Sequence, residues 1–236
     1  HARLFLRGFL WPEEIARLRK ASELTDLSIA AVAEGLKVGM REDEIPYLIE
    51  PAYLKEGGYA GIHFMSSMSM TEPDFPVPAQ FHSSRILQQG DCLITEISGA
   101  YWGYSGQIHR TFSLGEPTQA WQDLHAAAVE GYLAIEDALK DGATTSDIEN
   151  AAEIIHQHGY SIYDDLLHGV NQSPPIIQTR TTKRHENPEI TFRENMAITI
   201  QPNVITLDEK MGLQFGETVV VTKTGCERLN AWPREW

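Results

Sequence analysis

The sequence predicts an α+β fold in which two related halves share one curved antiparallel sheet, with helices on the outer face of that sheet. Apolar residues recur at helical spacing over residues 10–36 and again over 118–139, and β-prone runs follow each of these stretches. A short segment also occurs twice, as Leu36-Lys37-Val38-Gly39 and as Leu139-Lys140-Asp141-Gly142. Each half, over 10–115 and 116–225, therefore has the predicted order α-α-β-β-β.

The first half begins with the helix predicted over 10–36. Pro12 suits the first turn of this helix, and Glu13 and Glu14 suit the positive end of its dipole. The other predicted elements of this half are, in order, a helix at 42–56, a strand at 59–70, a proline-rich loop at 71–81 and a strand pair over 90–112 that turns at an aromatic-glycine corner.

The second half begins with the helix predicted over 118–139. A second helix is predicted over 148–158, with Thr145-Ser146-Asp147 as its cap. The remaining predicted elements are, in order, a β-prone run at 160–170, a polar loop at 171–187 and two further β-prone runs at 197–205 and 213–223. When two such halves pair, equivalent strand positions surround one central cleft, so we expect Glu96 and its counterpart Gln201 to lie there together.

Composition limits the functions that the chain can have. Its 236 residues are enough for one large domain, and no apolar run is long enough to cross a membrane. Two cysteines make no disulfide framework, so we expect free thiols and a cytoplasmic protein. The net charge of −14 opposes binding to nucleic acid and favours a small cationic or zwitterionic substrate.

Glu96 stands out in the predicted strand pair. Leu93, Ile94 and Ile97 make this run apolar, and Glu96 is its one ionisable residue. A carboxylate in a buried run must be paired, protonated or functional. The competing interpretation places Glu96 on an exposed edge.

Several short segments occur along the chain in a set order. They are Gly90-Asp91, Gly103-Tyr104, Arg110-Thr111-Phe112 before Gly115, His168-Gly169-Val170, Gln201-Pro202-Asn203, and Val221-Thr222 before Gly225. In these segments the whole chain resembles the pita-bread peptidase family of methionine aminopeptidase, Xaa-Pro peptidases and creatinase. The resemblance implies the pita-bread fold and a homodimer. Xaa-Pro peptidases and creatinase carry a further N-terminal domain, so we expect this chain to be truncated.

The resemblance also implies where a metal pair would bind in the family peptidases, whose ligands are two Asp, one His and two Glu. The matching residues here are, in order, Glu96, Gln107, His168, Gln201 and Gly216. Glu217 lies one place off and would point to the other face of its strand. Two divalent ions need several carboxylates, so we expect no metal pair and no other cofactor. A single weak ion on Glu96 and His168 is the alternative.

The positions that match the family's metal ligands here carry one acid, one imidazole and two amides. Such a polar pocket favours an enzyme active site over a pseudoenzyme that only binds. The pattern resembles ectoine hydrolase, a metal-free relative that opens a cyclic amidine. We therefore predict a metal-independent hydrolase of a small C–N bonded substrate such as a cyclic amidine. The alternatives are an Xaa-Pro-type peptidase, a creatinase-like amidinohydrolase and a pseudopeptidase.

Glu96 is the predicted nucleophile or general base, and His168 would donate to the leaving nitrogen or steady the tetrahedral centre. Gln107 and Gln201 would hydrogen-bond the heteroatoms of the substrate. Further candidates for the pocket wall are His63, His109, Arg110 and Tyr104. The competing interpretation is a structural histidine for the first two, an ion pair for Arg110 and packing for Tyr104.

Overall fold

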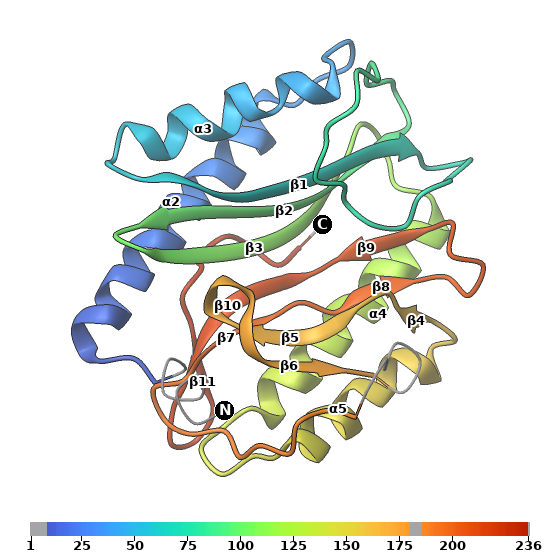
Figure 1. Cartoon of the computed structure of the whole chain (residues 1–236). Coiled ribbons are helices and arrows are strands. Elements are labelled where there is room, and N and C mark those ends of the chain that lie inside the picture. Colours follow the sequence, from blue (N-terminus) through green and yellow to red (C-terminus); the bar gives the residue numbers. More distant parts are fainter. Residues whose placement is uncertain (1–8, 180–185, 236) are drawn as a thin grey trace.

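The first half has the predicted order α-α-β-β-β, whereas the described part of the second half has two helices followed by eight strands instead of three (Figure 1). The computed structural model describes residues 9–179 and 186–235. The first half contains α2 (Pro12–Gly35), the 3-10 turn η2 (Glu42–Glu44), α3 (Pro46–Leu54), β1 (Tyr59–Ser69), β2 (Asp91–Tyr101) and β3 (Tyr104–Ser113). The second half contains α4 (Gln119–Ala138), α5 (Thr145–Gln157), β4 (Ser161–Ile162), β5 (Asp165–Gly169), the 3-10 turn η3 (Val170–Gln172), β6 (Ser173–Gln178), β7 (Ala197–Ile200), β8 (Asn203–Ile205), β9 (Gly212–Gln214), β10 (Gly216–Val221) and β11 (Cys226–Arg228).

The main sheet joins strands of both halves. It has eight strands in the order β1-β2-β3-β10-β7-β5-β6, with β11 paired to β10, and a second sheet has the order β4-β8-β9. Neighbouring strands are antiparallel. The two halves meet where β3 pairs with β10, and there His109 lies opposite Gly216 on one side and opposite Glu96 on the other. This register places three positions that the sequence singled out in one row across the sheet.

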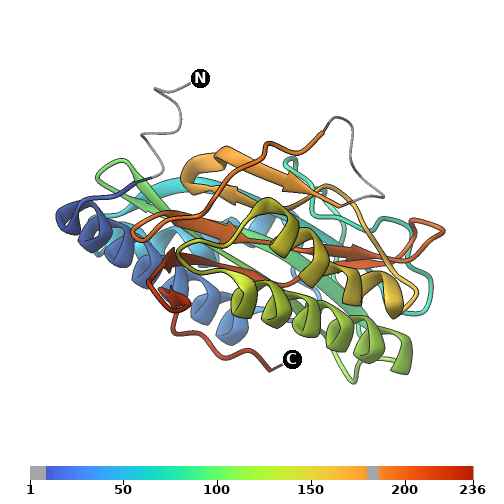
Figure 2. The same cartoon turned by 90° about the horizontal axis from the view of Figure 1, so that it is seen from below.

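The helices cover one face of the main sheet. Figures 1 and 2 show α2 and α4 on the same side of the strands, with α3 packed on α2 and α5 on α4. One hydrophobic cluster joins Leu24 of α2 to Ile97 of β2, and a larger one joins Trp121 of α4 to Phe215. No helix within the described ranges is apolar over enough of its length to cross a bilayer.

The β2–β3 hairpin confirms the predicted strand pair. Trp102 and Gly103 form its two-residue turn, and both have positive φ, 48° and 86°. Two left-handed residues in succession twist the chain in the sense that the flanking strands require. This tight turn holds the two strands in one register, and Glu96 therefore lies opposite His109.

Some element boundaries differ from the prediction. The loop predicted over 171–187 contains strand β6, whose prolines are tolerated because β6 lies at the edge of the main sheet. Residues 180–185 of that loop lie outside the described residues. The run predicted over 197–205 breaks at Gln201-Pro202 into β7 and β8, which belong to different sheets. The cap of α5 is Thr144 rather than Thr145, and β11 was not predicted.

Candidate active site

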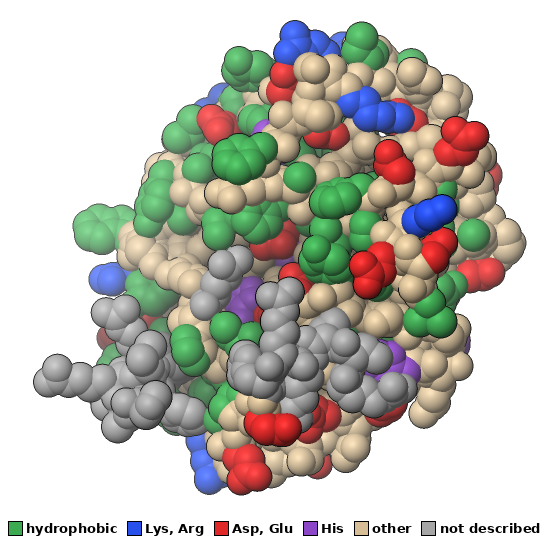
Figure 3. Space-filling model, turned by 45° about the vertical axis from the view of Figure 1, so that its right-hand side comes forward, with side chains coloured by type: hydrophobic (Ala, Val, Ile, Leu, Met, Phe, Trp, Pro, Cys, Tyr) green, Lys and Arg blue, Asp and Glu red, His purple; other side chains and the backbone are tan. Residues whose placement is uncertain are grey.

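A cavity of about 360 Å³ lies where the two halves meet, and its lining comes from both. Ile97 and Ile108 pack with Leu24 of α2, so alternation turns Glu96 and Gln107 to the face away from that helix. The polar lining includes Glu96 of β2, Asp164, Asp165 and His168 at β5, Gln201, Asn203 of β8 and Gln214 of β9. In Figure 3, hydrophobic side chains surround a hollow in which acidic and histidine side chains are visible.

Glu96 is buried in this cavity and is held by two amides. Its side chain accepts hydrogen bonds from Gln107 Nε2 at 2.5 Å and from Gln214 Nε2 at 3.2 Å. Burial raises the pKa of Glu96 to about 7; the nearby carboxyls of Asp164 and Asp165 also raise it, while the two amide donors oppose the rise. Near neutral pH this carboxyl is therefore present in both its protonated and its ionised form.

His168 is buried on β5 and faces Gln201. Its Nδ1 lies 2.7 Å from the carbonyl oxygen of Gly169, and its Nε2 lies 3.1 Å from Gln201 Oε1. Burial lowers the pKa of His168, which favours the uncharged ring. A neutral ring that donates through Nδ1 can only accept at Nε2. The contact with Gln201 thus becomes a hydrogen bond when His168 takes up a proton or when the amide turns over.

Amide side chains link the acid to the imidazole. Gln107 Nε2, besides its bond to Glu96, lies 3.2 Å from His109 Nε2 and 3.4 Å from Gln201 Oε1. Gln201 in turn contacts His168 and lies 3.4 Å from Asp165 Oδ1 through its Nε2. The structure thus brings Glu96, Gln107, His109, His168 and Gln201 into one buried polar network.

Comparison with known proteins shows the family and the fold of this chain. Residues 16–223 match the model of metallopeptidase family M24. The chain belongs to this family. As an M24 protein it is 26% identical to the Xaa-Pro dipeptidase of Pyrococcus furiosus over 231 residues, and 25% identical to that of Pyrococcus horikoshii over 226 residues. These alignments cover 98% and 94% of this chain.

The chain spans 65% and 62% of the length of those two dipeptidases. Among solved structures, the prolidase from Pyrococcus furiosus superposes with a TM-score of 0.87 at 25% identity, over 98% of this chain and 68% of that one. The X-Pro aminopeptidase from Thermotoga maritima MSB8 has a TM-score of 0.86 at 24% identity, over 99% of this chain and 65% of that one. These neighbours confirm the pita-bread fold.

The donor set of this M24 chain does not fit a metal pair. At the positions that the resemblance assigns to ligands, Gln107 and Gln201 are neutral amides, and Gly216 has no side chain. A Cβ on Gly216 would lie 2.6 Å from His109 Nδ1, so the His109 ring fills the space that a fifth ligand would need. Within the part of the chain that the structure describes, no group of three or more His, Cys, Asp or Glu could hold a metal ion.

Three predicted wall residues lie away from the cavity. His109 and Gln107 contact each other in the buried polar network but are not among the residues that line the cavity. His63 bonds through Nε2 to Tyr53 Oη of α3, at 3.1 Å, because its side chain turns toward that helix. Tyr104 at the hairpin turn donates to Glu14 of α2. These positions correct the expectation that His63 and Tyr104 line the pocket.

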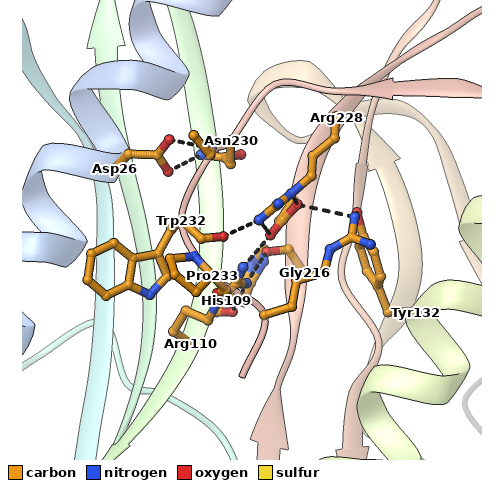
Figure 4. Close-up of polar contacts among 12 residues, drawn as sticks. Asp26, His109, Arg110, Tyr132, Gly216, Arg228, Asn230, Trp232 and Pro233 are labelled. Atoms are coloured by element: carbon orange, nitrogen blue, oxygen red, sulfur yellow. Dashed lines mark hydrogen bonds and ion pairs between the residues drawn. The ribbon is translucent and has the colours of Figure 1, made fainter. Parts of the chain in front are cut away.

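Arg110 is the third correction, because it points to the opposite face of β3 from His109. Its side chain is paired with Glu217 and donates to the backbone oxygens of His109 at 2.8 Å and Gly216 at 3.2 Å (Figure 4). Glu217 also binds Arg228, so it lies on the face away from the cavity as the sequence predicts. Arg110 therefore links β3 to β10 on the face of the sheet away from the cavity.

The sequence interpretation missed Asp164, Asp165, Asn203 and Gln214. Burial, and for Asp164 also the carboxyl of Asp165, raises the pKa of Asp164 to about 7 and that of Asp165 to about 6. The available signal was an acidic doublet inside the β-prone run that carries His168. Asn203 and Gln214 gave no such signal, because single amides are common in any strand.

Proposed function

We propose that this chain hydrolyses a C–N bond of a small substrate without a metal ion, with Glu96 as the reacting carboxylate. Membership of M24 supports hydrolysis of a C–N bond. The observation that carries the proposal is that Glu96 is surrounded by amide donors, Gln107 and Gln214, inside a substrate-sized cavity. Gln107, Gln201 and Gly216 leave too little negative charge for two divalent cations at the positions that the resemblance assigns to metal ligands.

A general-base route uses the raised pKa of Glu96. Its carboxylate takes a proton from a water molecule, and the water oxygen adds to the sp² carbon of the C–N bond while the π electrons of that carbon move onto its attached nitrogen or oxygen. These electrons form the C=N or C=O bond again when the leaving nitrogen departs. Protonated Glu96 then gives that proton to the leaving nitrogen as the bond breaks, which regenerates the carboxylate. A pKa of about 7 suits both transfers near neutral pH. As a nucleophile, Glu96 would instead form an acyl intermediate that water hydrolyses.

His168 has a narrower role in this proposal than the sequence suggested. A neutral ring with its proton on Nδ1 accepts through Nε2. It therefore orients the attacking water or a substrate N–H, and it donates to the leaving nitrogen only after taking up a proton.

Two substrate classes remain candidates. The M24 relatives are named Xaa-Pro dipeptidases, which favours an Xaa-Pro peptide over the cyclic amidine. The acidic cavity favours a substrate with a cationic amidinium group, such as the zwitterion ectoine, because Glu96, Asp164 and Asp165 all line the cavity. The donor set opposes metal-assisted peptide hydrolysis. We therefore propose a cyclic amidine as the first candidate substrate, and an Xaa-Pro peptide, which the relatives favour, as the second.

A substrate panel distinguishes these candidates. The purified protein is incubated with ectoine, creatine and Xaa-Pro dipeptides, with chelator and separately with added Mn²⁺ or Co²⁺, and products are measured by mass spectrometry. We expect turnover of a cyclic amidine that chelator leaves unchanged. Hydrolysis of Xaa-Pro dipeptides only with added metal would replace this proposal by the peptidase alternative, and no turnover with any substrate would favour a binding protein.

A further inference from the structure

The cavity contains oxygen atoms that the hydrolytic groups do not use. Asp165 Oδ2, Asn203 Oδ1 and Gln214 Oε1 are buried, and no hydrogen-bond partner for them is present among the described residues. Asn203 and Gln214 are 1% and 2% exposed and lie opposite each other on β8 and β9. All three residues line the same cavity as Glu96 and His168.

These atoms are all hydrogen-bond acceptors. Gln214 donates through Nε2 to Glu96, which fixes its Oε1 as the free end of the amide. Buried acceptors without donors are costly, and in native proteins they mark places where a ligand or an ordered water supplies the missing hydrogen. A molecule that fills this part of the cavity must therefore bring several N–H or O–H groups.

The charge of the cavity selects among such molecules. Glu96, Asp164 and Asp165 line the cavity, and its described lining contains no Lys or Arg. An anionic ligand would be repelled and a neutral one would leave the carboxylates uncompensated. A positively charged group with several N–H donors satisfies both the charge and the unpaired oxygens.

We propose that the substrate binds through a cationic, N–H-rich group, such as an amidinium, held by the Asp165 carboxylate and the side-chain oxygens of Asn203 and Gln214. This inference deepens the proposed hydrolase by naming the residues that select its substrate, and rests on it only for the reaction that follows. Gln201 connects the two functions, because it contacts both Asp165 and His168. The bound cation would thus lie next to the reacting groups.

Three small probes test the proposal without any turnover. Acetamidinium carries both charge and N–H donors, acetamide carries donors without charge, and tetramethylammonium carries charge without donors. Their dissociation constants are measured by calorimetry at constant ionic strength. We expect acetamidinium to bind at least about tenfold more tightly than either of the others, a difference of about 1.4 kcal/mol.

Variants assign that preference to residues. Asp165→Asn keeps the shape of the side chain and removes its charge, so it should lower the preference for acetamidinium over acetamide by about tenfold. Asn203→Ala should weaken acetamidinium several-fold. The matched control is Glu56→Gln, which removes one exposed charge outside the cavity and should change nothing. The preference is a ratio of two constants on one sample, so a partly unfolded variant does not distort it.

Equal affinity for all three probes, or an unchanged preference in Asp165→Asn, would overturn the proposal. Hydrolysis is scored separately on the substrate panel. Selective acetamidinium binding without any turnover would support the proposed binding group and refute the proposed hydrolase function. Turnover without selective binding would support the hydrolase function and refute the proposed binding group.

Discussion

At the scale of single residues, the proposed reaction depends on Glu96. It is 4% exposed, yet two amides donate to it, so burial and hydrogen bonding act on its pKa in opposite directions. Burial is the larger effect and raises the pKa to about 7. A carboxyl with this pKa changes charge near neutral pH, and a general base is most effective when its pKa lies near the working pH.

Replacing Glu96 with Gln should abolish turnover, by about 10²-fold or more, because the amide can neither accept the proton nor attack carbon. The side chain keeps its size, so the folded state should persist. Initial rates measure the first effect and thermal unfolding the second. Activity in Glu96→Gln close to that of the wild type would remove Glu96 from the mechanism.

The rate of hydrolysis should also increase with pH. The reacting form of Glu96 is ionised, so kcat/KM should rise as pH passes upward through about 7. Asp164 and Asp165 titrate nearby, so the apparent value belongs to the three carboxyls together. A rate that falls over this range would require a protonated acid instead.

At the scale of elements, β10 presents different chemistry on its two faces. Gly216 faces the cavity side and packs under His109, whereas Glu217 faces the helices and pairs with Arg110 and Arg228. The strand then continues into β11 and the C-terminal segment, where Asn230 and the backbone N–H of Ala231 donate to Asp26 of α2 (Figure 4). One strand therefore shapes the site and anchors the end of the described chain.

A side chain at Gly216 should destabilise the fold. A Cβ there would lie 2.3 Å from the carbonyl oxygen of Ile200, which is backbone and cannot move aside cheaply. We expect Gly216→Ala to lower the free energy of unfolding by about 1–3 kcal/mol in urea denaturation. Gly225→Ala is the control, since a Cβ there meets nothing within 4 Å, and should change it by less than about 0.5 kcal/mol. Equal effects of the two would refute the steric explanation.

Removing the charge of Glu217 should also be costly. Glu217→Gln leaves buried Arg110 without its counter-charge, and we expect a loss of about 3 kcal/mol in the free energy of unfolding. Glu227→Gln breaks the exposed pair with Arg19 and should cost less than about 1 kcal/mol. If both variants unfold at the same urea concentration as the wild type, the buried network contributes nothing to stability.

At the scale of the whole molecule, two halves supply one site. Glu96 comes from the first half, whereas His168, Gln201 and Gln214 come from the second, and the β3–β10 pairing joins them. With neutral amides at two of the positions that the resemblance assigns to ligands, the proposed function requires that the cavity bind organic groups without a pair of cations.

Elemental analysis of the purified protein should therefore find no stoichiometric Mn, Co or Zn. A metal that bound the folded state would raise the unfolding temperature, so neither added Mn²⁺ nor chelator should shift it. Chelator already saturated with Ca²⁺ is the control for effects of the reagent itself. Two bound metal ions per chain, with activity lost on their removal, would contradict this expectation.

The sequence by itself determined the order of the elements in the first half, the two helices that open the second half and the hairpin of β2 and β3. It also determined which residue types stand at the positions that the resemblance assigns to metal ligands. These features depend on local periodicity, on turn residues and on residue identity, which are readable along the chain. Only the tertiary structure decided which residues meet. His109 and Arg110 are neighbours in sequence, yet His109 contacts Gln107 in the polar network and Arg110 pairs with Glu217 on the opposite face of β3. Alternation along a strand puts the two side chains on opposite faces, but it does not tell which face carries the site. Asp165, Asn203 and Gln214 come from separate strands, and only long-range pairing brings their oxygens into one cavity.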